Sequence, residues 1–157
     1  AFHLNGRTRR PPLDRFNALI SFLYAMLMND CRSALEACGL DPQLGFLHAV
    51  RPGRAALALD LQEEFRAILC DRLALTLINR GQIGENDFDL HEGGAVMLND
   101  RGRRTVVTAW QDRKQEEITH PLTESRLPFA LLPFIQARFM ARALRGEMES
   151  YLPFLAK

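Results

Sequence analysis

The sequence has few cysteines, little net charge and no long apolar run, and each shortage excludes a class of protein. The three cysteines, Cys31, Cys38 and Cys70, are an odd number without the spacing of a metal site. They predict reduced thiols in a cytoplasmic protein rather than a disulfide framework. The longest apolar run, 18–28, is too short to span a bilayer, so we expect no membrane segment.

The start of the chain also lacks two features. The first residues are polar and basic with no apolar stretch behind them, which predicts that there is no secretory signal. There is no initiator methionine, and the opening loop leads directly into a helix, so we expect the 157 residues to be a fragment. Their number suits one domain, 1–157, with a core of its own.

The formal net charge is only +1, so composition alone makes no case for a nucleic-acid-binding protein. Arginine nevertheless outnumbers lysine heavily and occurs in groups, and its planar guanidinium suits phosphate. The groups lie near the start, in the middle and near the end: Arg7, Arg9 and Arg10; Arg101, Arg103 and Arg104; Arg138, Arg142 and Arg145. The last group has spacings of four and three and shares one helix face. It either binds phosphate or is simply solvated, and the first group either wraps a nucleic-acid backbone or is a chain end without a role.

Apolar spacing predicts a mainly α fold, a single helical domain with one small β-hairpin insertion. We expect a first, central helix from Pro12 to Cys38, a short helix after Asp41 that carries His48, and three further helices over about 56–80, 104–117 and 125–146. Pro133 is expected to kink or divide the last of these. The hairpin is expected within 84–102, with a turn at Gly93–Gly94 and a further turn at Asn99 to Gly102.

His48 lies in an apolar run, shortly before a Pro-Gly turn and a helix that we expect to open with Asp60, Glu63 and Glu64. Asp60 and Glu63 are three residues apart and therefore share a helix face. A loop that folds His48 back onto this face would make a partial site for a divalent metal that acts on phosphates. A plainer alternative is open: His48 can be a hydrogen-bonded core or loop residue, and the acids can complement the helix dipole.

Three segments in this order resemble the C-terminal helical domain of the CRISPR-associated integrase, the metal-dependent endonuclease usually counted first among the Cas proteins. They are RRPPLDRFNALISFLYAML, GFLHAVRPGRAALALDLQEEFR and HPLTESRLPFALLPFIQARFMARALRGEMESYLPFL. The similarity covers essentially the whole chain and looks closest to the subtype I-C branch. The segment around His48 is the most specific part, and the one around Gln136 supports it.

The resemblance implies that His48 and Glu63 are metal ligands and that Asp60 is a second acid of the same catalytic site. In the family a further glutamate, on a helix upstream, completes the site, and an N-terminal β-rich domain forms the dimer. Because the chain starts after both, we expect the fragment alone to bind metal weakly. Mg²⁺ suits carboxylate oxygens, and the imidazole favours Mn²⁺.

The resemblance also implies an activity and partners. Full-length relatives insert spacer DNA into a repeat array by attack of a 3′-hydroxyl on a phosphodiester. The expected partners are double-stranded DNA, a second copy of the protein and the companion second Cas protein, and the arginines would hold phosphates without reading bases. The alternative is a non-catalytic helical DNA-binding or assembly module, in which His48 and the acids serve only packing and capping.

Overall fold

The computed structural model describes residues 2, 6–8, 10–45 and 55–155. The helices are α1 (Arg15–Ala37), α2 (Ala56–Glu63), α3 (Arg72–Asn79), α4 (Asp100–Gln115) and α5 (Leu132–Leu144). Strands β1 (Phe88–Leu90) and β2 (Val96–Leu98) form one antiparallel hairpin, and β3 (Glu117–Thr119) and β4 (Arg126–Pro128) form another. The predicted mainly α class is confirmed, with two hairpins in the described residues where we expected one.

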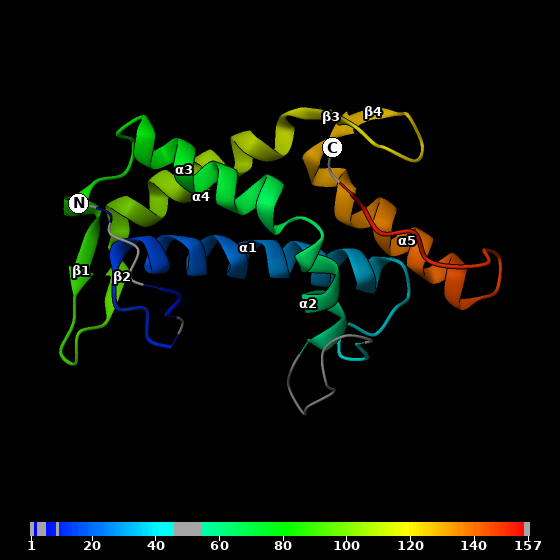
Figure 1. The fold of residues 1–157 in the computed structure, drawn as a ribbon, viewed down its shortest axis with the longest axis horizontal. Coiled ribbons are helices and arrows are strands. Elements are labelled where there is room, and N and C mark those ends of the chain that lie inside the picture. The colour runs from blue at the N-terminus through cyan, green and yellow to red at the C-terminus, as the bar shows by residue number, and fades with distance from the viewer. Residues whose placement is uncertain (1, 3–5, 9, 46–54, 156–157) are drawn as a thin grey trace.

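Helix α1 is the central element, as predicted. It contacts α2, α3, α5 and β2, and in Figure 1 it runs through the middle of the molecule with β1–β2 near one end and α5 near the other. It begins at Arg15 because the Asp14 carboxylate accepts a hydrogen bond from the backbone N–H of Asn17 at 2.7 Å, which caps the first turn. Its leucines form much of the core, and Leu19, Leu23, Leu27 and Leu35 are fully buried.

The prediction of one long second helix over 56–80 is wrong. Helix α2 ends at Glu63, a turn follows, and a π-helical segment (Arg66–Asp71) leads into α3. Phe65 lies in this turn and is fully buried against the ring of Phe154, with 5.6 Å between ring centroids. Because buried apolar residues continue on both sides of the break, their spacing along the sequence resembles that of one unbroken helix.

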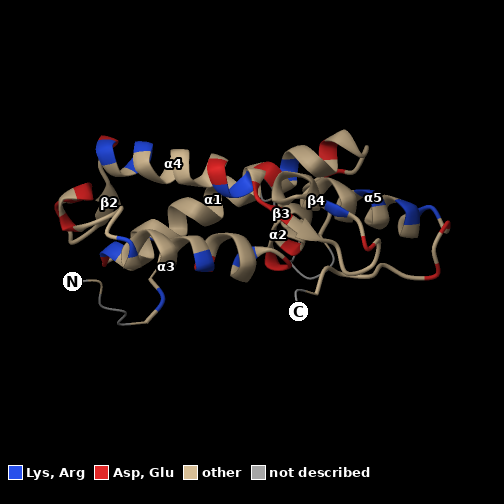
Figure 2. Cartoon of the chain, turned by 90° about the horizontal axis from the view of Figure 1, so that it is seen from above, with Lys and Arg blue, Asp and Glu red and all other residues tan. Residues whose placement is uncertain are grey.

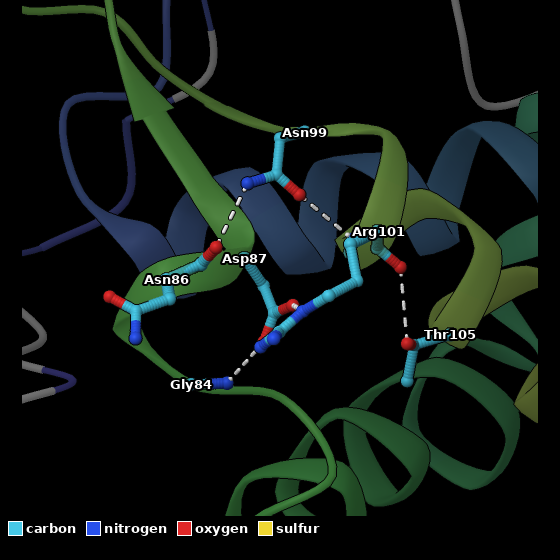
Figure 3. Close-up of polar contacts among 7 residues, drawn as sticks. Gly84, Asn86, Asp87, Asn99, Arg101 and Thr105 are labelled. Atoms are coloured by element: carbon cyan, nitrogen blue, oxygen red, sulfur yellow. Dashed lines mark hydrogen bonds and ion pairs between the residues drawn. The ribbon is translucent and has the colours of Figure 1, made fainter.

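The turn that we predicted at Asn99 to Gly102 is instead the start of α4. The Asn99 side chain accepts from the N–H of Gly102 at 3.0 Å and donates to the carbonyl oxygen of Asn86 at 2.9 Å. Asp87, which precedes β1, accepts from Nε of Arg101 at 2.6 Å and from the N–H of Gly84 at 2.8 Å (Figure 3). These bonds attach the first hairpin to α4. Gly102 fits because any Cβ there would lie 2.4 Å from the carbonyl oxygen of Asp87.

The helix predicted from Ser125 begins later than expected. The chain first forms β4 and a 3₁₀ turn (Phe129–Leu131), and α5 begins at Leu132. Pro133 lies in the first turn of α5, where its missing N–H costs no helical hydrogen bond, so it neither kinks nor divides the helix. The helix ends before Gly146, as predicted. None of the described helices has the length and apolar character needed to cross a membrane.

Candidate functional site

The two predicted acids lie on α2, but in its C-terminal half rather than at its start. Asp60 is buried, with 7% of its surface exposed, and Glu63 is the last residue of the helix, with 45% of its side chain exposed. The negative end of the helix dipole is at the C-terminus, so carboxylates there are not stabilised by it. The interpretation that these acids serve to complement the dipole is therefore wrong.

Glu63 is paired with an arginine that the sequence analysis did not single out. The guanidinium of Arg66 forms an ion pair with the Glu63 carboxylate and lies over the ring of Tyr24, 4.2 Å from its centroid. The guanidinium of Arg7 lies over the same ring at 5.6 Å and donates to Oδ1 of Asn17 at 2.6 Å. The ring of Tyr24 on α1 thus contacts two cations that are far apart in the sequence, and one of them, Arg66, pairs with Glu63.

Burial affects the ionisation of two groups in this region. It raises the pKa of Tyr24, and the hydrogen bond from its hydroxyl to Asp71 raises it further, so the phenol stays neutral at pH 7. Burial also raises the pKa of Glu64, although hydrogen bonds from Tyr151, Phe154 and Gln136 act in the opposite direction. Glu64 was expected at the helix start with the other acids; it is instead the partly buried C-cap of α2.

The three acids line one cleft of about 840 Å³. One wall consists of α2 and the π-helical segment, with Asp60, Glu63 and Glu64; the other consists of the end of α5 and the C-terminal segment Ser150 to Leu155. The rest of the lining is largely apolar and includes Ile68, Met140 and Phe154. The cleft therefore places carboxylate oxygens at the edge of a mostly apolar hollow.

His48 and Arg9 lie outside the described residues, so the predicted meeting of His48 with Glu63 remains a prediction. Among the described side chains there is no set of three His, Cys, Asp or Glu groups arranged to hold an ion. Asp60 and Glu63 nevertheless fit a hard divalent cation in part, because both present carboxylate oxygens to one cleft. His48 belongs to the segment that ends directly before α2.

The predicted arginine stripe at the end of the chain is exposed. Arg138 and Arg142 lie on α5 and Arg145 caps it; α5 itself carries no acid, and only basic residues are coloured on it in Figure 2. Arg142 and Arg145 share the carboxylate of Glu147, at 3.3 and 2.6 Å. Arg138 forms no ion pair with any acid in the described part of the chain. Arg10, near the other end, is also exposed.

Comparison with known proteins gives the following similarities. Residues 1–112 match the family model described as "CRISPR associated protein Cas1". The chain is 61% identical over 155 residues to CRISPR-associated endonuclease Cas1 1 of Moorella thermoacetica, covering 99% of this chain but 45% of that protein. It therefore spans less than half the length of this relative.

Two solved structures are similar in fold. A casposase bound to integration product superposes with a TM-score of 0.87 and 26% identity, over 95% of this chain and 44% of that one. A Cas6-RT-Cas1–Cas2 complex gives a TM-score of 0.82 and 28% identity, over 98% of this chain and 17% of that chain. The helical arrangement described above is thus shared with chains that are much longer.

Proposed function

Because the chain belongs to the Cas1 family of CRISPR-associated proteins, we propose that it is the C-terminal α-helical domain of a metal-dependent DNA endonuclease and integrase. In this proposal residues 1–157 follow a β-rich N-terminal domain and a helix that carries a further glutamate ligand. The Moorella relative is named an endonuclease, and the similar casposase is bound to an integration product. Both names support the assignment. The subtype I-C assignment remains a prediction from the sequence.

One observation carries the proposal: Asp60 and Glu63 line one cleft, and the guanidinium of Arg66 pairs with Glu63. Acids that hold a cation and guanidinium groups that hold phosphate are the two requirements for chemistry at a phosphodiester. Arg66 is already paired with Glu63, so a phosphodiester that binds to Arg66 comes close to that carboxylate. Arg7 lies over the same ring as Arg66 and supplies a second contact to the DNA backbone.

In this proposal Glu63 and His48 would hold Mg²⁺ or Mn²⁺, with Asp60 close by as the second acid. When bound, such an ion polarises a phosphoryl oxygen and favours attack by a hydroxyl. A 3′-hydroxyl of the spacer forms the new P–O bond, and the repeat strand leaves with its own 3′-oxygen, so one phosphodiester replaces another. Arg66 and Arg7 neutralise charge on the reacting phosphate.

The partners follow from the same proposal. Double-stranded DNA, both spacer and repeat, lies along the exposed arginines Arg138, Arg142 and Arg145, with Arg7, Arg9 and Arg10 at the other end of the chain. The full-length protein forms a homodimer and binds the companion Cas2, the protein with which the similar chain of the solved complex assembles. Cytoplasmic localisation fits a protein that acts on the CRISPR array.

The test uses the full-length protein with Mn²⁺ and a labelled spacer and repeat. We expect His48→Ala and Glu63→Ala each to reduce strand transfer by at least about 100-fold, because each removes a ligand, while circular dichroism remains unchanged. The matched control is Glu92→Ala, an exposed acid in the turn of the first hairpin, which should keep full activity. Undiminished activity in either ligand variant, together with no effect of Mn²⁺ on the melting temperature, would instead support the non-catalytic module.

A further inference from the structure

A partly buried carboxylate lies beside the proposed site. Glu64 follows Glu63, caps α2 and lines the same cleft. Its Oε2 accepts from the backbone N–H of Phe154 at 2.7 Å and from Nε2 of Gln136 at 2.9 Å, and its Oε1 accepts from the hydroxyl of Tyr151. All three donors are neutral, and no basic residue in the described part of the chain pairs with this carboxylate.

The orientation of Gln136 is fixed from its other side by His120. Both residues are fully buried. Nδ1 of His120 accepts from the backbone N–H groups of Leu122 and Thr123 at 3.2 and 3.3 Å. Nε2 must therefore carry the hydrogen, and it donates to Oε1 of Gln136 at 3.1 Å. The amide nitrogen of Gln136 consequently faces Glu64 rather than His120.

These bonds connect segments that are distant in the sequence. The amide nitrogen of Gln136 also contacts the hydroxyl oxygen of Tyr151 at 2.9 Å and the carbonyl oxygen of Leu152 at 3.2 Å. One network thus runs from the β3–β4 turn through α5 to the C-terminal segment and to the end of α2. The C-terminal segment and the end of α2 are the opposite walls of the cleft.

The network is an unfavourable way to join two walls if packing is its only purpose. A partly buried carboxylate that meets only neutral donors loses hydration without gaining an ion pair. A cation bound in the same cleft would offset this cost, so the arrangement suits a cation-binding site better than a plain core.

We propose that Glu64 and Gln136 are positioning residues of the strand-transfer site: they hold the C-terminal end of α2, and with it the Glu63 carboxylate, in a fixed position against the segment Tyr151 to Phe154. This inference rests on the proposed function, because it assigns the network to the same site. Partners that orient the ligands of a metal site typically change metal affinity or activity by about 10- to 100-fold when they are replaced.

The experiment compares two variants of the full-length protein, Gln136→Met and Glu64→Gln. Each is measured for Mn²⁺ affinity by electron paramagnetic resonance and for kcat and KM of strand transfer. We expect the single variants to bind Mn²⁺ about 10-fold more weakly and to lose kcat with little change in the KM for DNA.

Trp110→Phe serves as the matched control for stability. It removes the bond from the indole N–H to Asp30, at 3.2 Å, and neither of these residues lines the cleft. It should lower the melting temperature without changing Mn²⁺ affinity or kcat. Equal losses in Trp110→Phe and Gln136→Met at equal melting temperature would overturn the inference, since stability alone would then account for them.

Other results would separate the positioning role from the proposed function. Single variants with wild-type affinity and kcat would overturn the positioning role while leaving the proposed function intact. A wild-type protein that neither binds Mn²⁺ nor transfers strands would overturn the proposed function itself. If Gln136→Met does not fold, Tyr151→Phe, which removes a single donor to Glu64, should still lower kcat several-fold, and unchanged kcat in that variant would refute the inference.

Discussion

At the scale of single residues, the Asp87 carboxylate is the clearest example of a charge that stabilises the fold. It is almost fully buried and is held by Arg101, whose own side chain is 69% exposed. The hydrogen bond from Arg101, together with that from the N–H of Gly84, lowers the pKa of Asp87 below its ordinary value of about 4. Its carboxylate is therefore better stabilised in the folded than in the unfolded chain.

The direction of this shift predicts a pH dependence. Because the pKa is lower in the folded state, the contribution of Asp87 to the free energy of unfolding is complete above about pH 4 and is lost as the pH falls through the folded value. We expect Asp87→Asn to lower stability at about pH 7 and to reduce the loss of stability between about pH 5 and pH 3. Urea denaturation across this pH range measures the free energy of unfolding of both proteins. Asp89→Asn, an exposed change in the same hairpin, should keep the wild-type profile, and an identical profile for Asp87→Asn would contradict the argument.

At the scale of elements, two helices begin with capping side chains that stabilise different amounts of structure. Asp14 caps α1, and its carboxylate accepts from both the backbone N–H and the side-chain amide of Asn17, so its bonds stay within the first turn. Asn99 caps α4 and in addition donates to Asn86, which joins the helix to the first hairpin. The second cap therefore supports two elements rather than one.

We accordingly expect Asn99→Ala to lower the free energy of unfolding by about 2 kcal/mol, at the upper end of the range for caps, because a hydrogen bond to the hairpin is lost as well. Asn99→Ser, which keeps a capping oxygen but cannot reach Asn86 in the same way, should recover about half of this. Chemical denaturation at neutral pH measures both. A loss in Asn99→Ala no larger than that of an exposed helical change such as Thr108→Ala would show that the cap contributes nothing.

The elements also show what the sequence could and could not predict. The central helix, the hairpin around Gly93–Gly94 and the helix end before Gly146 follow from apolar spacing and glycine positions, and all three are confirmed. The break after Glu63 was missed because burial continues across it, as it does at Phe65 and Leu69. The strands of both hairpins are three residues long. The second hairpin was missed because its turn contains no glycine pair such as Gly93–Gly94, which marked the first.

For the site, the sequence identified the acids of α2 but not what surrounds them. Asp60 and Glu63 share a cleft, as their spacing suggested. Arg66 is three residues from Glu63, a spacing that marks helical ion pairs, and could have been found by that rule. The role of Tyr24 as the ring beneath two arginines could not be predicted from the sequence, because it depends on how α1 packs against the π-helical segment. The contacts of Gln136 and His120 likewise depend on tertiary structure.

At the scale of the whole molecule, α5 carries two arginines and no acid, and Arg145 caps its end (Figure 2). A DNA backbone that follows α5 would release counterions at each arginine that it contacts. Arg142 and Arg145 share Glu147, so part of their charge is already compensated, whereas Arg138 has no acidic partner among the described residues.

Under the proposed function, this difference sets the salt dependence of DNA binding by the full-length protein. Replacing Arg138, Arg142 and Arg145 together with alanine should reduce the slope of log K against log salt by about 2 to 3. Arg138→Ala should be the largest single contributor. Fluorescence anisotropy between about 50 and 200 mM salt measures the slope. Arg126→Ala, whose partner Glu117 lies at 2.6 Å, is the control and should leave the slope unchanged; an unchanged slope in the triple variant would remove α5 from the interface.

The position of Leu155 has a practical consequence for anyone who expresses this protein. This residue lies in the wall of the cleft that contains Asp60 and Glu63. A tag placed close behind Leu155 would lie beside that wall, and the imidazoles of a polyhistidine tag compete for divalent ions wherever the tag is placed. The Gly93–Gly94 turn is exposed and lies on a hairpin outside that lining, so a tag without histidine inserted there would leave metal titrations undistorted.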